Sequence, residues 1–221
     1  CECIVGLTPG GCTDHPEVRS YMVRFLNEIG KRYGKRKEVI GWDCWNETRW
    51  NVHSDGYVCY CPETLKRFRD FLKREYGDLD GLNNAWKRRY TDWADVFPGR
   101  VPDGRTYTET MEFSRFLTWR AADIMRSRAQ ALREAGVQGI LSAHCGAPSI
   151  LSSGWKEEQP LCRGNDWDFM EFLDGFGCSH FPSWGSFDDR EFGIRVEAIR
   201  SAVGKKILWV SELQGGAARD G

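Results

Sequence analysis

Short apolar segments alternate along the chain with longer amphipathic segments. Five segments of five to eight residues are mostly apolar, as buried parallel strands are: residues 3–7, 38–45, 139–145, 175–181 and 206–213. Six segments of eight residues or more predict helices: residues 16–33, 62–76, 78–90, 108–135, 166–173 and 189–203. Strand and helix in regular alternation predict a parallel sheet with helices packed outside it.

The start of the first helix illustrates the local signals. Asp14 is of the type that caps a helix N-terminus, and Pro16 suits a first helical position. Gly34 predicts the end of the helix.

Both a doubly wound sheet and a β/α barrel fit this order of elements. Two features favour the barrel: no glycine-rich phosphate loop follows a strand, and the long loops come after strands. In addition, polar residues lie at the C-terminal tips of successive strands, namely Glu47, His144, His180 and Glu212. Five strands do not close an eight-stranded barrel. We therefore predict a partial (β/α)8 barrel.

Two glutamates end apolar strands in similar contexts. Glu47 ends "VIGWDCWNE" and Glu212 ends "ILWVSE". Strand tips converge on the axis of a barrel, so these carboxylates can meet there. Such a pair is what glycoside hydrolysis requires. The alternative for either residue is a structural role in a first helical turn, where the helix dipole favours a carboxylate.

Composition narrows the classes of partner. Lys and Arg total 31 against 32 Asp and Glu, so no charge field points to nucleic acid or to a membrane surface. No apolar stretch approaches the ~18–20 residues of a membrane span. Ten Trp, twelve Phe and seven Tyr fit either a carbohydrate site lined by stacking rings or a large aromatic core.

The cysteines suggest a cellular compartment, and the two ends of the chain suggest a truncated domain. Nine cysteines scattered through an α/β pattern favour a reducing, cytoplasmic compartment with thiols unpaired or on a metal. The first residue is Cys1, and the chain stops abruptly after "GGAARDG". We expect residues 1–221 to be a single truncated catalytic domain.

The chain resembles glycoside hydrolase family 42, the β-galactosidase-like (β/α)8 barrels of clan A. The matching segments are "YMVRFLNEIGKRYGKRKEVIGWDCWNE", "YVCYCPETLKRFRDFLKREYGDLDGLNNAWKRRYTDW", "EFSRFLTWRAADIMRSRAQALRE", "LDGFGCSHFP" and "WVSELQGG". The resemblance implies a chain that runs from about the third barrel strand to the seventh. The first two strands, the last strand and later domains would be absent.

The resemblance also implies a retaining double displacement. Glu47 would be the general acid/base, Glu212 the nucleophile, and Asn46 a contact to the sugar 2-hydroxyl. Glu212 must then stay ionised while Glu47 holds a proton, which an apolar surround such as Trp42 and Trp45 would favour. No cofactor is needed for this chemistry.

Many relatives in that family hold a structural zinc, and the resemblance extends to three of its ligands. Cys12, Cys59 and Cys61 match ligand positions, whereas Thr64 stands at the fourth. Structural zinc normally has four N or S ligands. The site is either completed by His53, Cys44 or water, or it is degenerate and binds no metal.

Several positions depart from the family pattern and bear on which sugar is bound. His144 stands where Asn is more usual, Phe181 replaces a Tyr, and Thr8 replaces an Arg. His144 and His180 are candidate contacts to sugar hydroxyls, or else satisfied polar residues at strand ends. Further candidates are tryptophans in loops after strands, which either stack on sugars or pack between loops: Trp50, Trp155 and Trp184.

We therefore expect a retaining glycoside hydrolase that cleaves β-linked galactose-like sugars. Its partner would be an oligosaccharide or β-galactoside substrate, with neither nucleic acid nor membrane involved, and relatives suggest a homo-oligomer. The alternatives are another retaining β-glycosidase of the same clan, a carbohydrate-binding barrel without turnover, and a zinc-stabilised structural module.

Overall fold

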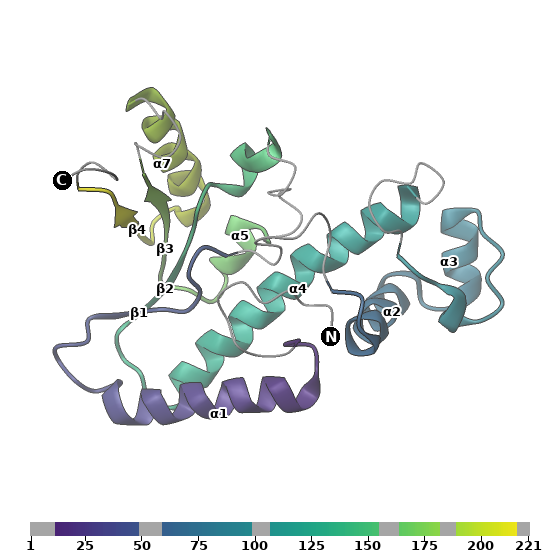
Figure 1. Cartoon of the computed structure of the whole chain (residues 1–221), viewed down its shortest axis with the longest axis horizontal. Coiled ribbons are helices and arrows are strands. Elements are labelled where there is room, and N and C mark those ends of the chain that lie inside the picture. The colour runs from purple at the N-terminus through teal and green to yellow at the C-terminus, as the bar shows by residue number, and fades with distance from the viewer. Residues whose placement is uncertain (1–11, 49–58, 99–106, 155–163, 182–188, 216–221) are drawn as a thin grey trace, which may run out of the picture.

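Four parallel strands form a single sheet in the order β1-β2-β3-β4 (Figure 1). The computed structural model describes residues 12–48, 59–98, 107–154, 164–181 and 189–215. The strands are β1 Gly41–Asp43, β2 Ile140–Cys145, β3 Gly175–His180 and β4 Ile207–Leu213. They correspond to four of the five predicted strands, and the fifth, residues 3–7, lies outside the described residues.

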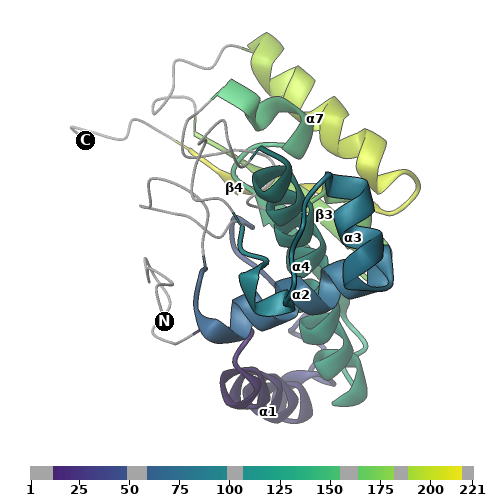
Figure 2. The same cartoon turned by 90° about the vertical axis from the view of Figure 1, so that its right-hand side faces the viewer.

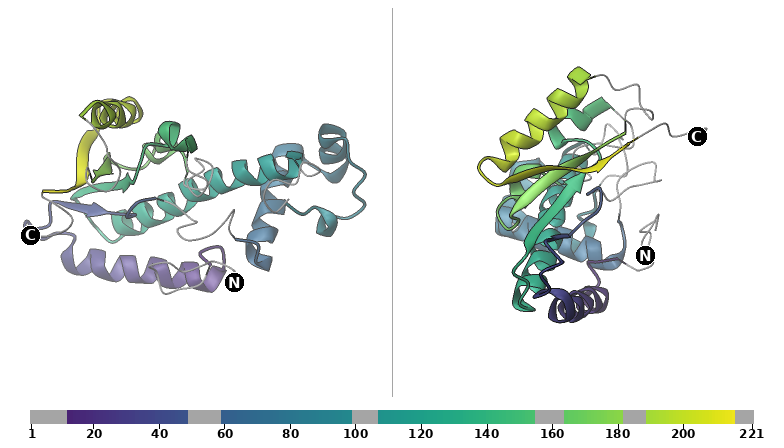
Figure 3. Two further views of the ribbon diagram at one scale, coloured as in Figure 1. Left: turned by 45° about the horizontal axis from the view of Figure 1, so that its top comes forward. Right: turned by 90° about the vertical axis from the view of Figure 1, so that its left-hand side faces the viewer.

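Helices fill the connections between the strands. They are α1 Pro16–Tyr33, α2 Pro62–Tyr76, α3 Leu79–Trp86, α4 Tyr107–Glu134, α5 Asp166–Phe169 and α7 Asp189–Val203, with short 3-10 helices η1 Trp93–Asp95 and η2 Ser149–Gly154. α1 and α7 lie at opposite sides of the fan of strands (Figure 3). None of the helices in the described part of the chain has the length and apolar character needed to cross a bilayer.

One face of the sheet carries the main hydrophobic core. Leu141 and Ala143 of β2 and Phe176 of β3 are fully buried, and they pack with Met125 and Leu132 of α4. Side chains alternate along a strand, so the residues between these buried ones lie on the opposite face of the sheet. Helices packed on one face, with a parallel sheet curved around the other, confirm the predicted partial (β/α)8 barrel.

The inner face of the half-barrel combines glycines with the indole of Trp209. A Cβ atom added to Gly177 would lie 2.3 Å from Cδ1 of Trp209 and 2.6 Å from its carbonyl oxygen. The same indole extends toward β1, where its Cη2 atom would be 3.8 Å from a Cβ on Gly41. Glycine at position 177 therefore makes the room for Trp209 to lie across the inner face.

Helix α4 joins two separate cores. Its C-terminal half packs on the sheet, while Phe113 and Phe116 of its N-terminal half pack with Phe68 and Phe71 of α2. Their rings meet at centroid distances of 5.2 to 5.8 Å. α2 and α3 thus form an extension beside one end of α4, away from the strands (Figures 1 and 2).

Three elements are clearly shorter than predicted, namely β1, α3 and α5. β1 ends at Asp43 because the chain then turns, although it stays bonded to β2. α3 ends at Trp86 because Lys87 adopts a left-handed φ of 57°. α5 ends at Phe169, and Lys206 donates to the carbonyls of the turn that follows.

The contact at Gly177 gives a direct test of the inner face. We expect Gly177→Ala to lower the free energy of unfolding by about 1–3 kcal/mol, because backbone as well as side chain must shift. Gly193→Ala is the matched control: Gly193 lies on α7 with no heavy atom within 4 Å of an added Cβ. There alanine should raise the stability by up to about 1 kcal/mol. Urea unfolding followed by tryptophan fluorescence measures both, and equal effects would refute this packing.

Candidate active site

Ionisable side chains gather at the carboxyl edge of the sheet. Asp43 ends β1, His144 lies near the end of β2, and Glu212 lies near the end of β4. Parallel strands all end at the same edge, which is where β/α barrels place their active sites. The chain thus brings together residues that are far apart in its sequence.

A β-bulge turns Glu212 toward the interior of the half-barrel. Val210 pairs with Cys178 and the next pair is Ser179 with Glu212, so β4 holds one extra residue, Ser211. Strict alternation would place Glu212 on the outer face together with Val210. Because the bulge shifts the alternation by one residue, the glutamate lies on the inner face instead.

His144 lies between two carboxylates. Its Nδ1 atom is 2.8 Å from Asp43 Oδ2, and its Nε2 atom is 3.1 Å from Glu212 Oε1. The imidazole is only 2% exposed, whereas the side chains of Asp43 and Glu212 are 38% and 36% exposed. Burial alone would lower the pKa of His144, but the hydrogen bonds and charges of Asp43 and Glu212 outweigh it, so the pKa is raised.

The segment that carries Glu47 is fixed to the end of β2 by main-chain bonds. The N–H of Thr48 donates to the His144 carbonyl at 3.0 Å, and the N–H of His144 donates to the Trp45 carbonyl at 3.4 Å. Glu47 itself has a left-handed φ of 43°, which is uncommon for a non-glycine residue and is a form of strain found at functional sites.

The side chain of Glu47 lies against Gly146. A Cβ atom at this glycine would be 3.3 Å from Glu47 Oε1. Gly146 is two residues beyond His144, the residue that contacts Glu212. Residues two apart on an extended chain are about 6–7 Å apart. Both carboxylates are therefore held against the end of a single strand, β2.

Two arginines of the outer helices support these segments. Arg128 of α4 donates to the Cys44 carbonyl at 2.9 Å, and its guanidinium lies 4.7 Å from the ring centre of Trp45. Burial lowers the pKa of Arg128. Arg195 of α7 donates to the Gly146 carbonyl at 3.0 Å. The outer helix layer therefore positions the loops on which Glu47 depends.

The other predicted sugar contacts lie in different settings. Asn46 is exposed in the turn before Glu47. His180 is buried, and its ring stacks on Phe192 of α7 with centroids 4.2 Å apart. Phe181 follows β3 and is partly exposed. Trp184 lies outside the described residues, as do Trp50 and Trp155, and the sugar contacts of all these residues stay predictions.

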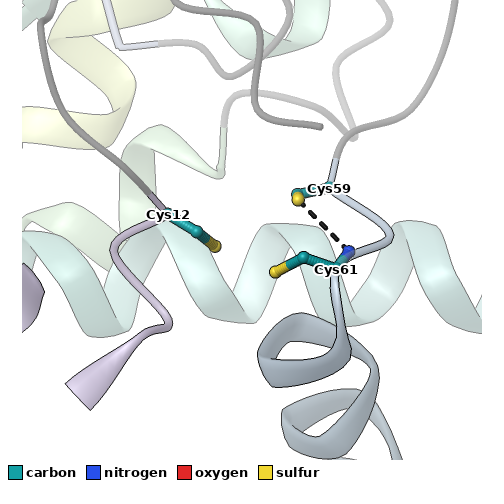
Figure 4. A group of neighbouring side chains, drawn as sticks. All are labelled: Cys12, Cys59 and Cys61. Atoms are coloured by element: carbon teal, nitrogen blue, oxygen red, sulfur yellow. Dashed lines mark hydrogen bonds between the residues drawn. The ribbon is translucent and has the colours of Figure 1, made fainter. Parts of the chain in front are cut away.

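The predicted zinc ligands come together in the structure. Cys12 precedes α1, whereas Cys59 and Cys61 precede α2, and their Sγ atoms all lie within 4.8 Å of one another (Figure 4). The N–H of Cys61 donates to Cys59 Sγ at 3.3 Å. All three residues are buried. This arrangement can supply three corners of a tetrahedral metal site.

Thr64 occupies the region where a fourth ligand would lie. Its hydroxyl is 3.2 Å from Cys12 Sγ and 3.4 Å from Cys61 Sγ, and it donates to Asp14 Oδ2 at 2.6 Å. Cys44, named above as a possible replacement, instead belongs to the sheet core, where burial raises the pKa of its thiol to about 12. His53 lies outside the described residues.

The prediction that Asp14 caps α1 was wrong. His15 is the N-cap, and its Nδ1 accepts from the N–H of Glu17. Asp14 is instead a buried anion: Arg120 Nε is 2.7 Å from Oδ2, and Arg67 Nη1 is 2.8 Å from Oδ1. The Asp14 carboxylate is directed at the two guanidinium groups and not at the first helical N–H groups, so the cap falls to the next residue.

Sequence reasoning missed Asp43 and the buried ion pair. A signal for Asp43 exists, because aspartate is depleted in strands and stands here within an otherwise apolar one. Arg120 lies among buried residues of α4 and is fully buried itself. A cation on the apolar face of a helix predicts a buried partner, but the sequence does not say which.

The ion pair of Arg120 with Asp14 generates a stability prediction. Arg120→Met should lower the free energy of unfolding by about 3 kcal/mol or more, since it leaves a buried carboxylate with one cation fewer. Arg115→Met, also on α4 but half exposed, should cost about 0–1 kcal/mol. Chemical denaturation measures both. Adding Asp14→Asn to Arg120→Met should restore part of the loss, and a double variant no more stable than the single one would contradict the pairing.

Comparisons with known proteins agree with this geometry. The chain is 29% identical over 190 residues to the β-galactosidase BglY of Alicyclobacillus acidocaldarius. This alignment covers 82% of this chain and 24% of that protein. It is 27% identical over 219 residues to the β-galactosidase Bga of Halorubrum lacusprofundi, covering 93% and 30%. The chain thus spans about a quarter to a third of the length of these curated relatives.

Solved structures share the fold. The β-galactosidase of Halorubrum lacusprofundi superposes with a TM-score of 0.74 at 22% identity, covering 94% of this chain and 32% of that one. A family 42 exo-carrageenase of Bacteroides ovatus superposes with a TM-score of 0.69 at 18% identity, covering 94% and 31%. The sequence model of the family described as β-galactosidase matches residues 5–219. The chain therefore belongs to the β-galactosidase family, glycoside hydrolase family 42.

Proposed function

We propose that this chain, within a complete barrel, is the catalytic part of a retaining glycoside hydrolase that acts on β-linked galactose-like sugars. The observation that carries the proposal is the placement of Glu47 and Glu212 against one strand end, at Gly146 and His144. Membership of the β-galactosidase family and the names of the relatives support the substrate class.

The two glutamates would take different roles in a double displacement. Glu47 gives its proton to the glycosidic oxygen as the Glu212 carboxylate attacks the anomeric carbon, which forms a glycosyl ester and releases the leaving alcohol. Glu47 then takes a proton from water, and the water oxygen displaces Glu212 from the anomeric carbon. Asn46, exposed directly before Glu47, would contact the sugar beside the reacting carbon.

A different sugar is the second candidate. A departure from the family pattern favours it, because Phe181 follows β3 where a Tyr is usual. The buried, carboxylate-bound His144 also differs from the Asn that is more usual in the family. An assay on a panel of nitrophenyl β-glycosides decides between galactose and other sugars.

Substitution of the two glutamates tests the catalytic roles. In the complete barrel, Glu47→Gln should reduce kcat/KM by about 10²–10⁴-fold on substrates with poor leaving groups, and less on nitrophenyl glycosides, which need little protonation. Glu212→Gln should abolish turnover of both classes because the covalent intermediate cannot form. The matched control is Glu28→Gln on α1, more than half exposed, which should retain full activity.

Product stereochemistry assigns the roles independently of rates. Azide added to Glu47→Ala should give a β-glycosyl azide, since azide replaces water in the second displacement. Azide added to Glu212→Ala should give the α-glycosyl azide by a single displacement. The same anomer from both variants, or undiminished turnover in Glu212→Gln, would refute the assignment.

We also propose that Cys12, Cys59 and Cys61 hold a structural zinc whose fourth ligand is water or the Thr64 hydroxyl. The close approach of the three sulfur atoms and their burial support it. The neighbouring Arg120, whose Nη2 is 3.5 Å from Cys12 Sγ, offsets the surplus negative charge that three thiolates leave on Zn²⁺. The ion would join the start of α1 to the start of α2.

Metal content tests this site without reference to activity. The chain should carry about one zinc per molecule, lost in Cys59→Ser. Thr64→Cys should slow the release of zinc to a chromophoric chelator because it completes a four-thiolate site, whereas Thr64→Ser should leave the release unchanged. Elemental analysis that finds no more zinc in the parent chain than in Cys59→Ser would refute the proposal.

A further inference from the structure

The two ring nitrogens of His144 both need a hydrogen. Nδ1 is 2.8 Å from a carboxylate oxygen of Asp43, and Nε2 is 3.1 Å from one of Glu212. A neutral imidazole has a single N–H, so its other nitrogen would direct a lone pair at an anionic acceptor. The imidazolium form carries a hydrogen on both nitrogens, so it donates from Nε2 to Glu212 and directs no lone pair at Asp43.

The surroundings of His144 favour this charged form. Asp43 comes from β1 and Glu212 from β4, while β3 places Gly177 opposite His144 and Ser179 opposite Glu212. The two carboxylates are partly exposed, so water stabilises their remaining negative charge. Other ionisable groups at this edge include Glu47 over Gly146, Arg195 on the Gly146 carbonyl, and His180, whose ring stacks on Phe192.

Asp43 also reaches the segment that carries Glu47. Its second oxygen, Oδ1, accepts from the N–H of Trp45 at 3.2 Å. One carboxylate therefore orients the imidazole and the turn before Glu47 at once. A displacement of Asp43 would affect both catalytic glutamates.

We infer that Asp43 and His144 form a positioning pair in which an imidazolium, oriented by Asp43, holds the Glu212 carboxylate in place for attack. The inference rests on the proposed function, because it assigns the pair to the nucleophile of that reaction. The imidazolium keeps one oxygen of Glu212 engaged and leaves the other for the anomeric carbon. When the glycosyl ester breaks down, the same hydrogen bond receives the returning negative charge and assists departure of Glu212.

The pair predicts that activity falls as the pH becomes alkaline. The pKa of His144 is raised above the ordinary value of about 6.5. The imidazolium and the hydrogen bonds that it makes are therefore complete below that ordinary value. They are lost as the pH rises through the raised pKa of the folded protein, when one of the two carboxylates loses its donor.

Nitrogen-15 NMR of the chain tests the protonation state directly. We expect both ring nitrogens of His144 to be protonated at pH 7, with the signals identified from their absence in His144→Gln. Asp43→Asn should lower the titration midpoint of His144 by about 1–3 pH units, because it removes an anionic neighbour. The ring signals of His15, exposed at the start of α1, should be the same in both proteins and serve as the control. A neutral His144 at pH 7, or a midpoint that Asp43→Asn leaves unchanged, overturns the inference.

The pH profile of the complete barrel tests the link to Glu212. Asp43→Asn should move the alkaline limb of kcat toward lower pH, and His144→Gln should remove that limb. A merely structural role would lower activity equally at every pH. Asp92→Asn, a matched change at the N-cap of η1, should leave the profile as it is. An unmoved limb in Asp43→Asn overturns the inference.

The two tests also separate this inference from the proposed function. If the complete barrel is inactive but His144 is doubly protonated, the proposed glycosidase function is refuted. The pair of Asp43 and His144 then exists but has no catalytic role. An active barrel with a neutral His144 would refute the pair alone.

Discussion

The contact of the His144 imidazole with two carboxylates organises the carboxyl edge of this half-barrel. Its ring joins β2 to Asp43 of β1 and Glu212 of β4, while its main-chain N–H and C=O bond the segment that carries Glu47. The ends of β1 and β4 and the segment that carries Glu47 are therefore linked through a single residue. A single shared support suits a site in which two carboxylates must keep a fixed separation, because it prevents them from moving apart.

Support for that edge comes from the outer helix layer as well as from the strands. Arg128 and Arg195 reach from α4 and α7 to carbonyl groups of the loops that follow β1 and β2. Long cationic side chains can cross the layer because their stems pack among apolar residues. A second set of contacts lies near the starts of α1 and α2, where Cys12, Cys59 and Cys61 come together. The ion pairs of Asp14 with Arg67 and Arg120 join this region to α2 and α4. Helix α4 therefore contributes both to the buried ion pairs and to the support of the candidate active site.

The sequence was sufficient for the order of elements because hydrophobic periodicity is strong in helices such as α2 and α4 and in buried strands such as β3. It was also sufficient to single out Glu47 and Glu212 as strand-end carboxylates. It could not identify the partner of His144, because that pairing depends on which strands become neighbours. The cap at His15 was missed for a related reason: Asp14 has a strong local preference, but the buried Arg120 outweighs it. At Asp14, therefore, tertiary electrostatics overrode a local rule.

The single extra residue in β4 has a consequence for how this strand can be altered or transferred. Ser211 shifts the phase of the strand, so residues on either side of it obey opposite inside-outside rules. If the strand ran regularly with Ser211 retained, the carboxylate of Glu212 would turn into the apolar helix layer. Deletion of Ser211 would instead leave Glu212 opposite Ser179 on the inner face. A chimera that borrows this strand for another barrel must therefore either keep the irregularity or omit Ser211. The number of residues between Val210 and Glu212, and not the glutamate alone, decides on which face the carboxylate lies.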